Sequence, residues 1–158
     1  MVVPTLNGRA SLADCLDALA DHVAEAEVVV VNGPSSDGTS GFVRDHRVVD
    51  LLLEVSERNL DAARNAGIAA ATGDAVAFVG QSSAVKPEWR DALDDALDAG
   101  ADAVTGPVHR LVEGGHTTES PRTGTFAGRE VTFFDGGNVA FTRDALDALD
   151  GFDEYLDA

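Results

Sequence analysis

Short apolar runs and amphipathic stretches alternate along the first 105 residues of the chain. Strand-like runs fall at 1–4, 27–31, 48–55, 74–80 and 102–105. Helical periodicity fills the segments between them, at 11–24, 39–45, 60–71 and 87–99. Because parallel strands need a crossover between them, usually a helix, this alternation predicts a sheet covered by helices. We therefore expect an α/β fold: three Rossmann-like layers with a mostly parallel central sheet, and a ligand crevice at the carboxyl ends of its strands.

The pattern changes near residue 106. Residues 106–130 are rich in glycine, threonine and charge and show little periodicity, which predicts a loop or a ragged hairpin over one face of the sheet. Short strands at 131–134 and 139–141, with a turn between them, precede a last helix at 143–149. The 158 residues contain no interdomain linker and are enough for one core, so a single domain is expected.

The chain carries 28 acidic and 11 basic side chains, a formal net charge of -17, and its only lysine is Lys86. A field of this sign repels the phosphates of nucleic acids and anionic lipids, so neither is an expected partner. The same charge weakens the compact state at low ionic strength. At about 1 M salt, where the Debye length is roughly 3 Å, this repulsion largely disappears. We therefore expect an acidic protein adapted to a halophilic, high-salt cytoplasm.

Cysteine usage and apolar run lengths bear on the compartment. Cys15 is the only cysteine, which excludes an intrachain disulfide and a thiolate metal cluster. It lies in the apolar stripe of the helix expected at 11–24, so packing in the core is its expected role. The sequence shows no leader with a charged and an apolar region, and no apolar stretch approaches the ~20 residues that span a bilayer. We expect no transmembrane segment and a cytoplasmic location.

Polar loops follow the first two predicted strands, at the edge where a ligand is expected. The first reads PTLNG over residues 4–8 and the second reads NGPSSDGT over 32–39. Taken alone, the second loop has a structural explanation, because Asp-Gly forms turns and Ser or Thr caps helices. Arg64, on the third predicted helix, also allows two interpretations: a solvated side chain or one that meets phosphate charge.

Several sequence blocks together resemble the family-2 glycosyltransferases, which have the GT-A fold. In chain order they are PTLN, VVVNGPSSDGT, ARNAGI, ATGD, AFVG, KPEW, GGNVAF and GFDE. In the family the first two usually read PTYN and a loop like VV(V/D)DGSTDGT. The blocks keep the family's order and spacing from Val3 to Glu154, and only residues 106–130, where family members also vary, lie outside the resemblance.

The resemblance implies an enzyme that transfers a sugar from a nucleotide-diphosphate sugar to an acceptor hydroxyl, generally with Mg²⁺ or Mn²⁺ on the diphosphate. It makes 1–105 the nucleotide-binding half and 106–158 the acceptor-side half. The donor-binding residues that it implies are Pro4, Thr5, Leu6, Asn32, Asp37, Arg64, Gly80, Gln81 and Ser82. The acceptor-side residues are Gly136, Gly137 and Asn138. The acceptor itself, a saccharide, a lipid or a protein glycan, is left open.

The chemistry of these positions suits a nucleotide sugar. Pro4 and Leu6 offer an apolar wall for a base, and the Asn32 amide can both accept and donate hydrogen bonds at a base edge. The glycine turn at 136–138 would let a sugar approach the backbone closely, although it also fits a simple hairpin turn. Packing for Trp89 and exposure for His109 and His116 are the simpler interpretations of the remaining aromatic and imidazole side chains.

The chain departs from the family after the strand expected at 74–80. The family carries there an acidic DXD-type motif whose carboxylates hold the metal, whereas this chain reads Gly80-Gln81-Ser82-Ser83. Mg²⁺ is usually held by one or two carboxylates plus substrate phosphates. The nearest acids, Asp74 and Glu88, lie at the wrong end of the strand and on the following helix. We therefore predict that the metal ligands are missing.

A second departure concerns the general base. Beyond GFDE the family normally presents an acidic pair that contains the base, whereas this sequence ends at Ala158, so we expect a truncated acceptor-side half in which Asp157 is the nearest candidate. Loss of metal and base removes charge stabilisation of the diphosphate and a proton transfer typically worth about 10²- to 10⁴-fold. Transfer is then expected to be slow or absent, unless Arg64 or Lys86 offsets the diphosphate charge.

Three functions stay open on the sequence. The first is a family-2 glycosyltransferase, weak or inactive as the chain stands. The second is a non-catalytic nucleotide-sugar-binding or interaction module on a GT-A scaffold. The third, another nucleotide-binding Rossmann-like domain such as a nucleotidyltransferase, is disfavoured because no basic glycine-rich loop follows the first strand. A homo-oligomer, in which a second subunit supplies missing residues, also stays open.

Overall fold

The computed structural model describes residues 1–112, 115–126, 129–133 and 135–155. Its first part alternates β1 (Val2–Thr5), α1 (Arg9–His22), β2 (Val29–Asn32), α2 (Thr39–Arg44), β3 (Leu51–Glu54), α3 (Leu60–Ala70), β4 (Ala75–Val79), α4 (Trp89–Asp98) and β5 (Ala103–Thr105). The second part contains β6 (Val108–Val112), β7 (Gly115–Glu119), β8 (Arg122–Phe126), β9 (Arg129–Phe133), β10 (Asn138–Thr142) and α5 (Arg143–Leu149).

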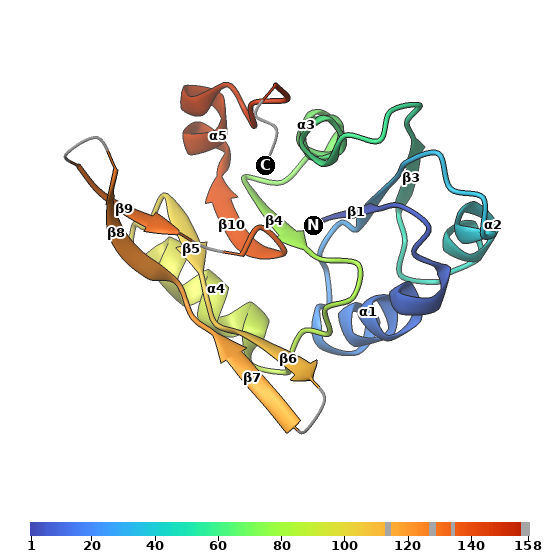
Figure 1. The fold of residues 1–158 in the computed structure, drawn as a ribbon, viewed down its shortest axis with the longest axis horizontal. Coiled ribbons are helices and arrows are strands. Elements are labelled where there is room, and N and C mark those ends of the chain that lie inside the picture. Colours follow the sequence, from blue (N-terminus) through green and yellow to red (C-terminus); the bar gives the residue numbers. More distant parts are fainter. Residues whose placement is uncertain (113–114, 127–128, 134, 156–158) are drawn as a thin grey trace.

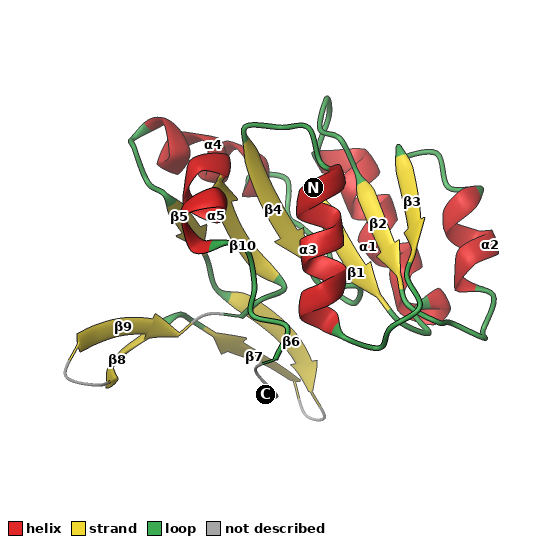
Figure 2. Cartoon of the chain, turned by 90° about the horizontal axis from the view of Figure 1, so that it is seen from above, coloured by secondary structure: helices red, strands yellow, loops and turns green. Residues whose placement is uncertain are grey.

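Six strands form one sheet in the order β3-β2-β1-β4-β10-β5 (Figures 1 and 2). β1 to β4 run parallel, and β10 lies antiparallel between β4 and β5. The predicted α/β class with a mostly parallel sheet is therefore confirmed. The chain winds outward from β1 to β3 and then returns to the other side of β1 with β4. The carboxyl ends of β1 and β4 thus form a topological switch point, where sheets of this kind bind ligands.

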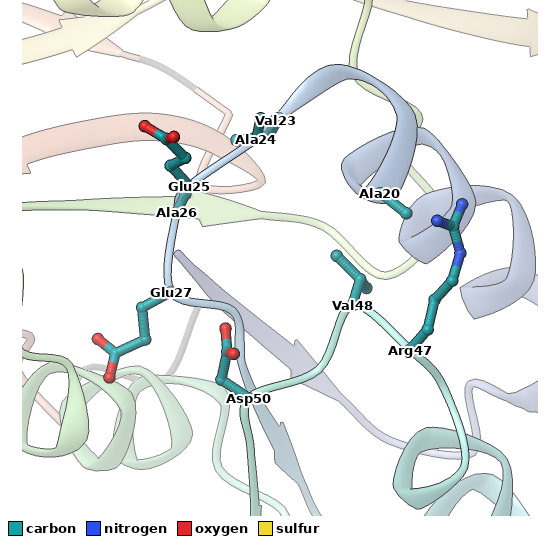
Figure 3. Close-up of a pocket in the computed structure, with 9 residues that line it drawn as sticks. All are labelled: Ala20, Val23, Ala24, Glu25, Ala26, Glu27, Arg47, Val48 and Asp50. Carbon is teal, nitrogen blue, oxygen red and sulfur yellow. The ribbon is translucent and has the colours of Figure 1, made fainter.

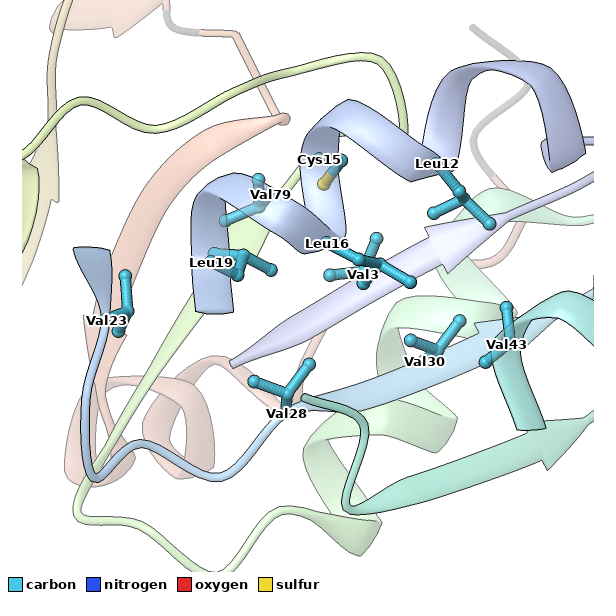
Figure 4. Packing of buried hydrophobic residues seen from close by; sticks show 10 residues of the cluster. All are labelled: Val3, Leu12, Cys15, Leu16, Leu19, Val23, Val28, Val30, Val43 and Val79. Atoms are coloured by element: carbon cyan, nitrogen blue, oxygen red, sulfur yellow. The ribbon is translucent and has the colours of Figure 1, made fainter. Parts of the chain in front are cut away.

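Helices cover both faces of the sheet (Figure 1). α1, α2 and the start of α4 pack on one face, where Leu12, Leu16 and Leu19 of α1 meet the valines of β1 and β2 (Figure 4). α3 and α5 pack on the other face around Phe78.

Cys15 lies fully buried in the first layer, as predicted, and burial raises the pKa of its thiol to about 12. Within the described residues, no helix combines the length and the hydropathy needed to cross a membrane.

The largest difference from the prediction lies in the segment after β5. In place of one loop or ragged hairpin over a sheet face, two hairpins form, β6–β7 and β8–β9, each a separate two-stranded sheet. They extend from the β5 side beyond the carboxyl ends of the main strands (Figure 2). A two-stranded hairpin with solvent on its faces needs no alternation of apolar residues, so its sequence carries little period. β9 pairs with β8 and β10 joins the main sheet, so the turn at 135–138 connects two different sheets.

Close packing of α3 on β1 depends on Gly67. A Cβ at this position would lie 2.4 Å from Val2 Cγ1, inside a buried layer, whereas a Cβ at Gly41 of α2 would meet nothing within 4 Å. We expect Gly67→Ala to lower the free energy of unfolding by about 1 to 3 kcal/mol through overpacking. Gly41→Ala should instead raise it by up to about 1 kcal/mol, because alanine favours helix. Urea unfolding of both variants measures the difference; equal stability would contradict this packing.

Candidate functional site

A cavity of about 400 Å³ opens at the carboxyl ends of β1 and β4. Its walls come from the loops after these strands, the start of α3 with the segment before it, and the turn before β10. Seven of the predicted donor-binding residues line it: Pro4, Thr5, Leu6, Arg64, Gly80, Gln81 and Ser82. Gly136 and Gly137, predicted on the acceptor side, line it as well. The cavity therefore gathers residues that are up to 133 positions apart, from Pro4 to Gly137.

The side chain of Gln81 ties the end of β4 to the end of β1. Its Oε1 accepts a hydrogen bond of 2.6 Å from Thr5 Oγ1 and one of 3.0 Å from the Leu6 N–H. Because a carbonyl oxygen has two lone pairs, these two bonds use its accepting capacity. A Cβ at Gly8 would lie 2.2 Å from Thr5 Oγ1 and 2.7 Å from Gln81 Oε1, so glycine leaves the room that this contact needs.

The turn before β10 brings bare backbone to the cavity. The Gly80 N–H donates to Gly137 O at 3.0 Å, which joins the turn to the end of β4. Within the turn, the Gly137 N–H donates to Asp135 Oδ1 at 2.8 Å. A Cβ at Gly136 would lie 2.3 Å from Arg64 Nη2. Only glycine therefore lets the guanidinium lie against the backbone here.

Arg64 is fixed on the cavity wall, so of its two interpretations the solvated one does not apply. Its side chain is 13% exposed, Nη1 pairs with Asp61 Oδ1 at 2.6 Å, and Nη2 donates to Gly136 O at 3.2 Å. The guanidinium carbon lies 5.0 Å from the centroid of the Phe152 ring, within cation–π range. Its Nε is buried and has no hydrogen-bond partner among the described residues. Arg64 thus presents a positive charge that Asp61 partly offsets.

Two asparagines hold the GFDE segment against α3. Asn65 Oδ1 accepts from the Phe152 N–H at 2.8 Å, and its Nδ2 donates to Phe152 O at 2.9 Å. Asn59 caps the first turn of α3 with Oδ1 and donates from Nδ2 to Glu154 O at 2.9 Å. These bonds place the Phe152 ring beside Arg64. The GFDE segment therefore does not line the cavity itself but supports Arg64, which does.

Asn32 lies at the end of β2, outside the cavity lining. It is 1% exposed, accepts a hydrogen bond of 2.6 Å from Ser35 Oγ at Oδ1, and donates one of 2.9 Å to Ser40 Oγ. Both ends of the amide are therefore engaged within the protein. The loop that it stabilises contributes Gly33 to the cavity.

Asp37 also lies outside the lining and has a structural role. Its Oδ2 accepts from the Arg9 N–H at 3.0 Å and its Oδ1 from the Thr39 N–H at 3.1 Å, the first residues of α1 and α2. A carboxylate at two helix N-termini is favourable, because it pairs with N–H groups that have no partner within the helix. The Thr39 hydroxyl, which also donates to this carboxylate, lowers the pKa of Asp37.

The other predicted residues lie elsewhere. Asn138 faces α4, since its Oδ1 accepts from Trp89 Nε1 at 2.8 Å, and the tryptophan packs against the core. His109 is exposed and bonds to Thr118 Oγ1 at 2.8 Å through Nδ1. Lys86 is exposed and is not part of the lining. Asp157 lies outside the described residues.

A second hollow, of about 610 Å³, lies at the amino ends of the strands (Figure 3). It is open to solvent between the end of α1 and the turn before β3. Two of its carboxylates are engaged within the protein: Asp50 Oδ2 accepts from the Val28 N–H at 2.8 Å, and Glu27 Oε2 from the Thr72 N–H at 2.7 Å. It is far from the switch point, so we take the 400 Å³ cavity as the candidate site.

The family model described as "Glycosyl transferase family 2" matches residues 1–149 of the chain. The chain belongs to this family. The resemblance inferred from the sequence blocks is therefore confirmed. Among curated proteins, glycosyltransferase AglE of Haloferax volcanii is 27% identical over 140 residues, which cover 84% of this chain and 44% of AglE.

Solved structures show the same GT-A fold. S. aureus TarS has a TM-score of 0.75 at 21% identity, over 99% of this chain and 50% of that chain, and it has also been solved with UDP. The mannosyltransferase PcManGT from Pyrobaculum calidifontis, in complex with GDP-Man and Mn²⁺, has a TM-score of 0.74 at 24% identity, over 98% and 47% of the two chains. This family-2 chain thus spans half or less of the length of these relatives.

Seven residues that line the cavity of this family-2 domain were not among those predicted from the sequence: Gly33, Glu57, Arg58, Asn59, Leu60, Ala63 and Asp135. One signal was available, because an asparagine immediately before a predicted helix is a preferred N-cap and marks where the helix begins. Leu60 and Ala63 lie in the first turn of α3, and the remaining four stand in irregular segments, where no periodicity indicates which way a side chain points. The segment that leads from β3 into α3 brings four of the seven to the switch point, namely Glu57, Arg58, Asn59 and Leu60.

The cavity residues do not fit the divalent metal that family-2 members commonly use. The loop after β4 supplies no carboxylate: Gln81 Oε1 already accepts two hydrogen bonds, and Ser82 offers only a neutral hydroxyl. Of the two lining carboxylates, Glu57 stands on the β3–α3 segment, and Asp135 Oδ1 accepts from the Gly137 N–H. Within the described part of the chain, no three His, Cys, Asp or Glu side chains form a group that could hold a metal ion.

Proposed function

We propose that the chain is the donor-binding domain of a glycosyltransferase, which takes a nucleotide-diphosphate sugar into the switch-point cavity and passes the sugar to an acceptor hydroxyl. One observation carries the proposal: a family-2 chain gathers its PTLN, ARNAGI and GGN blocks around a single cavity. Ligand-bound neighbours support it, since TarS has been solved with UDP and PcManGT with GDP-Man.

The cavity suggests a role for each wall. Pro4 and Leu6 provide apolar surface for a base, and Arg64 provides the fixed positive charge. Gly136 and Gly137 leave space where the sugar would pass toward the acceptor side. We name no general base among the described residues. A single domain spanning the whole chain, a cytoplasmic location and a high-salt setting stay predictions from the sequence, and the nature of the acceptor stays open.

Thermal melting with UDP or GDP tests this function. A ligand that binds only the folded state stabilises it by about 2.7 kcal/mol at a hundredfold excess over Kd, which should raise Tm by several degrees. Gly136→Ala, whose methyl would displace the Arg64 guanidinium, should reduce the rise, whereas the distant Gly41→Ala should keep it. If neither nucleotide raised Tm of the unsubstituted protein at any concentration, the proposal would be wrong. Turnover of UDP- or GDP-sugars would separate a transferase from a module that only binds them.

A further inference from the structure

The loop after β4 is committed to holding the fold together. Gln81 stands in the family's metal-motif segment, and its only oxygen acceptor on the side chain is bonded to both Thr5 and Leu6. Gly8 packs tightly against this contact. The uncharged Gln81 amide thus links the end of β1 to the end of β4. A carboxylate at the same place could bind a cation. If Gln81 Oε1 were to bind a metal ion, it would have to give up the two hydrogen bonds that join the ends of β1 and β4 at the cavity.

Positive charge reaches the cavity from another direction. Its described lining contains two arginines, both from the α3 side: Arg58 before the helix and Arg64 on it. Arg64 is 13% exposed and fixed by Asp61, Gly136 and the Phe152 ring. Arg58 is exposed on the rim. A guanidinium binds phosphate oxygens in a charge-assisted, often bidentate way, and its charge does not depend on pH in the physiological range.

We propose that this chain binds the diphosphate of its donor without a divalent metal, with Arg58 and Arg64 facing the diphosphate in place of the metal. The inference rests on the proposed donor binding. Arg64 supplies a fixed charge at the cavity wall, and Arg58 closes on the diphosphate from the rim. In a chain with net charge -17, these two arginines are the positively charged side chains of the described lining, and they attract a dianionic ligand electrostatically.

Calorimetric titration of the full chain with UDP and with GDP tests the inference, once in EDTA and once in MnCl₂ at the same ionic strength. We expect each nucleotide's Kd to agree between the two conditions to within about twofold. A Kd that fell tenfold or more with Mn²⁺ would overturn the metal-free diphosphate site while supporting donor binding. Absence of binding by either nucleotide in both conditions would overturn the proposed function and this inference with it.

Arg58→Ala tests the arginine assignment in EDTA. Because Arg58 is exposed, its replacement should leave the fold intact, and loss of one charge-assisted contact should raise Kd by about tenfold. Arg47→Ala is the matched control: it removes the same charge from a side chain that is 71% exposed at the opposite hollow, and it should leave Kd unchanged. Equal effects of the two substitutions would show that net charge alone matters, which contradicts the assignment.

Discussion

Nucleotide affinity should become dependent on Mn²⁺ when Gly80 and Ser82 are both replaced by aspartate. The resemblance to the family assigns these positions to the segment of the acidic motif, and both line the cavity. A Cβ at Gly80 would meet Ser83 Oγ at 3.1 Å, a side-chain end that can turn away. Two carboxylates next to a diphosphate supply the ligands that a hard dication needs. We expect Mn²⁺ to improve the Kd for UDP or GDP by about tenfold or more in this variant.

The neutral double variant, Gly80→Asn with Ser82→Asn, is the control for this experiment. It has nearly the same size and adds no charge, so any change that comes from crowding alone should appear in both variants. Mn²⁺ should leave its Kd unchanged. If the aspartate variant folded, bound nucleotide and still ignored Mn²⁺, the assignment of residues 80–83 to the metal-motif position would be wrong.

Stability should rise steeply with salt. The four aspartates of α4 illustrate why: Asp94 pairs with Arg90 at 2.6 Å, whereas Asp95 and Asp98 lie toward the C-terminal end of a helix that has no basic residue in its last turn. Acids there oppose the helix dipole, and like charges one turn apart cost about 0.2 to 0.5 kcal/mol per pair at low salt. Summed over a net charge of -17, the repulsion that molar KCl screens should raise Tm by roughly 10 °C.

Asp95→Asn with Asp98→Asn separates charge screening from a general salt effect. Both side chains are exposed, so the substitutions should raise Tm in dilute buffer and reduce the further gain from KCl. A Tm that did not change between dilute buffer and molar KCl would contradict the high-salt adaptation inferred from the sequence. If KCl raised Tm equally in the parent protein and in the double variant, repulsion between these aspartates would not be the cause of the rise.

The layered core could be predicted because apolar periodicity records burial directly. The valines of β1 and β2 are buried on both faces of the sheet, and the apolar stripe of α1 is buried on one face, as their patterns require. Two features left no such record. β3 starts at Leu51 and not at Val48, because Val48 and Val49 pack from a turn rather than from a strand. The antiparallel insertion of β10 between β4 and β5 depends on pairing between distant segments, which a single sequence does not reveal.

Placement at the cavity could be predicted from the sequence where a motif fixed a strand end, and could not be predicted where the chemistry of a residue allowed two roles. Thr5, Gln81 and Gly136 lie at the cavity because the strand ends and the turn before β10 place them there. Asn32 and Asp37 are good hydrogen-bond formers, but the nearest partners are the protein's own hydroxyl and N–H groups. Residue type predicts that such side chains will form hydrogen bonds. Whether the partner is a ligand or another part of the protein depends on the fold.

Amide chemical-shift mapping by NMR during a UDP or GDP titration tests the central claim most directly. Nucleotide in the switch-point cavity should shift the amides of Thr5, Gly33, Gly80 and Gly136, which come from four separate loops. Shifts confined to Ala20, Val48 and Asp50, around the hollow at the amino ends of the strands, would contradict it.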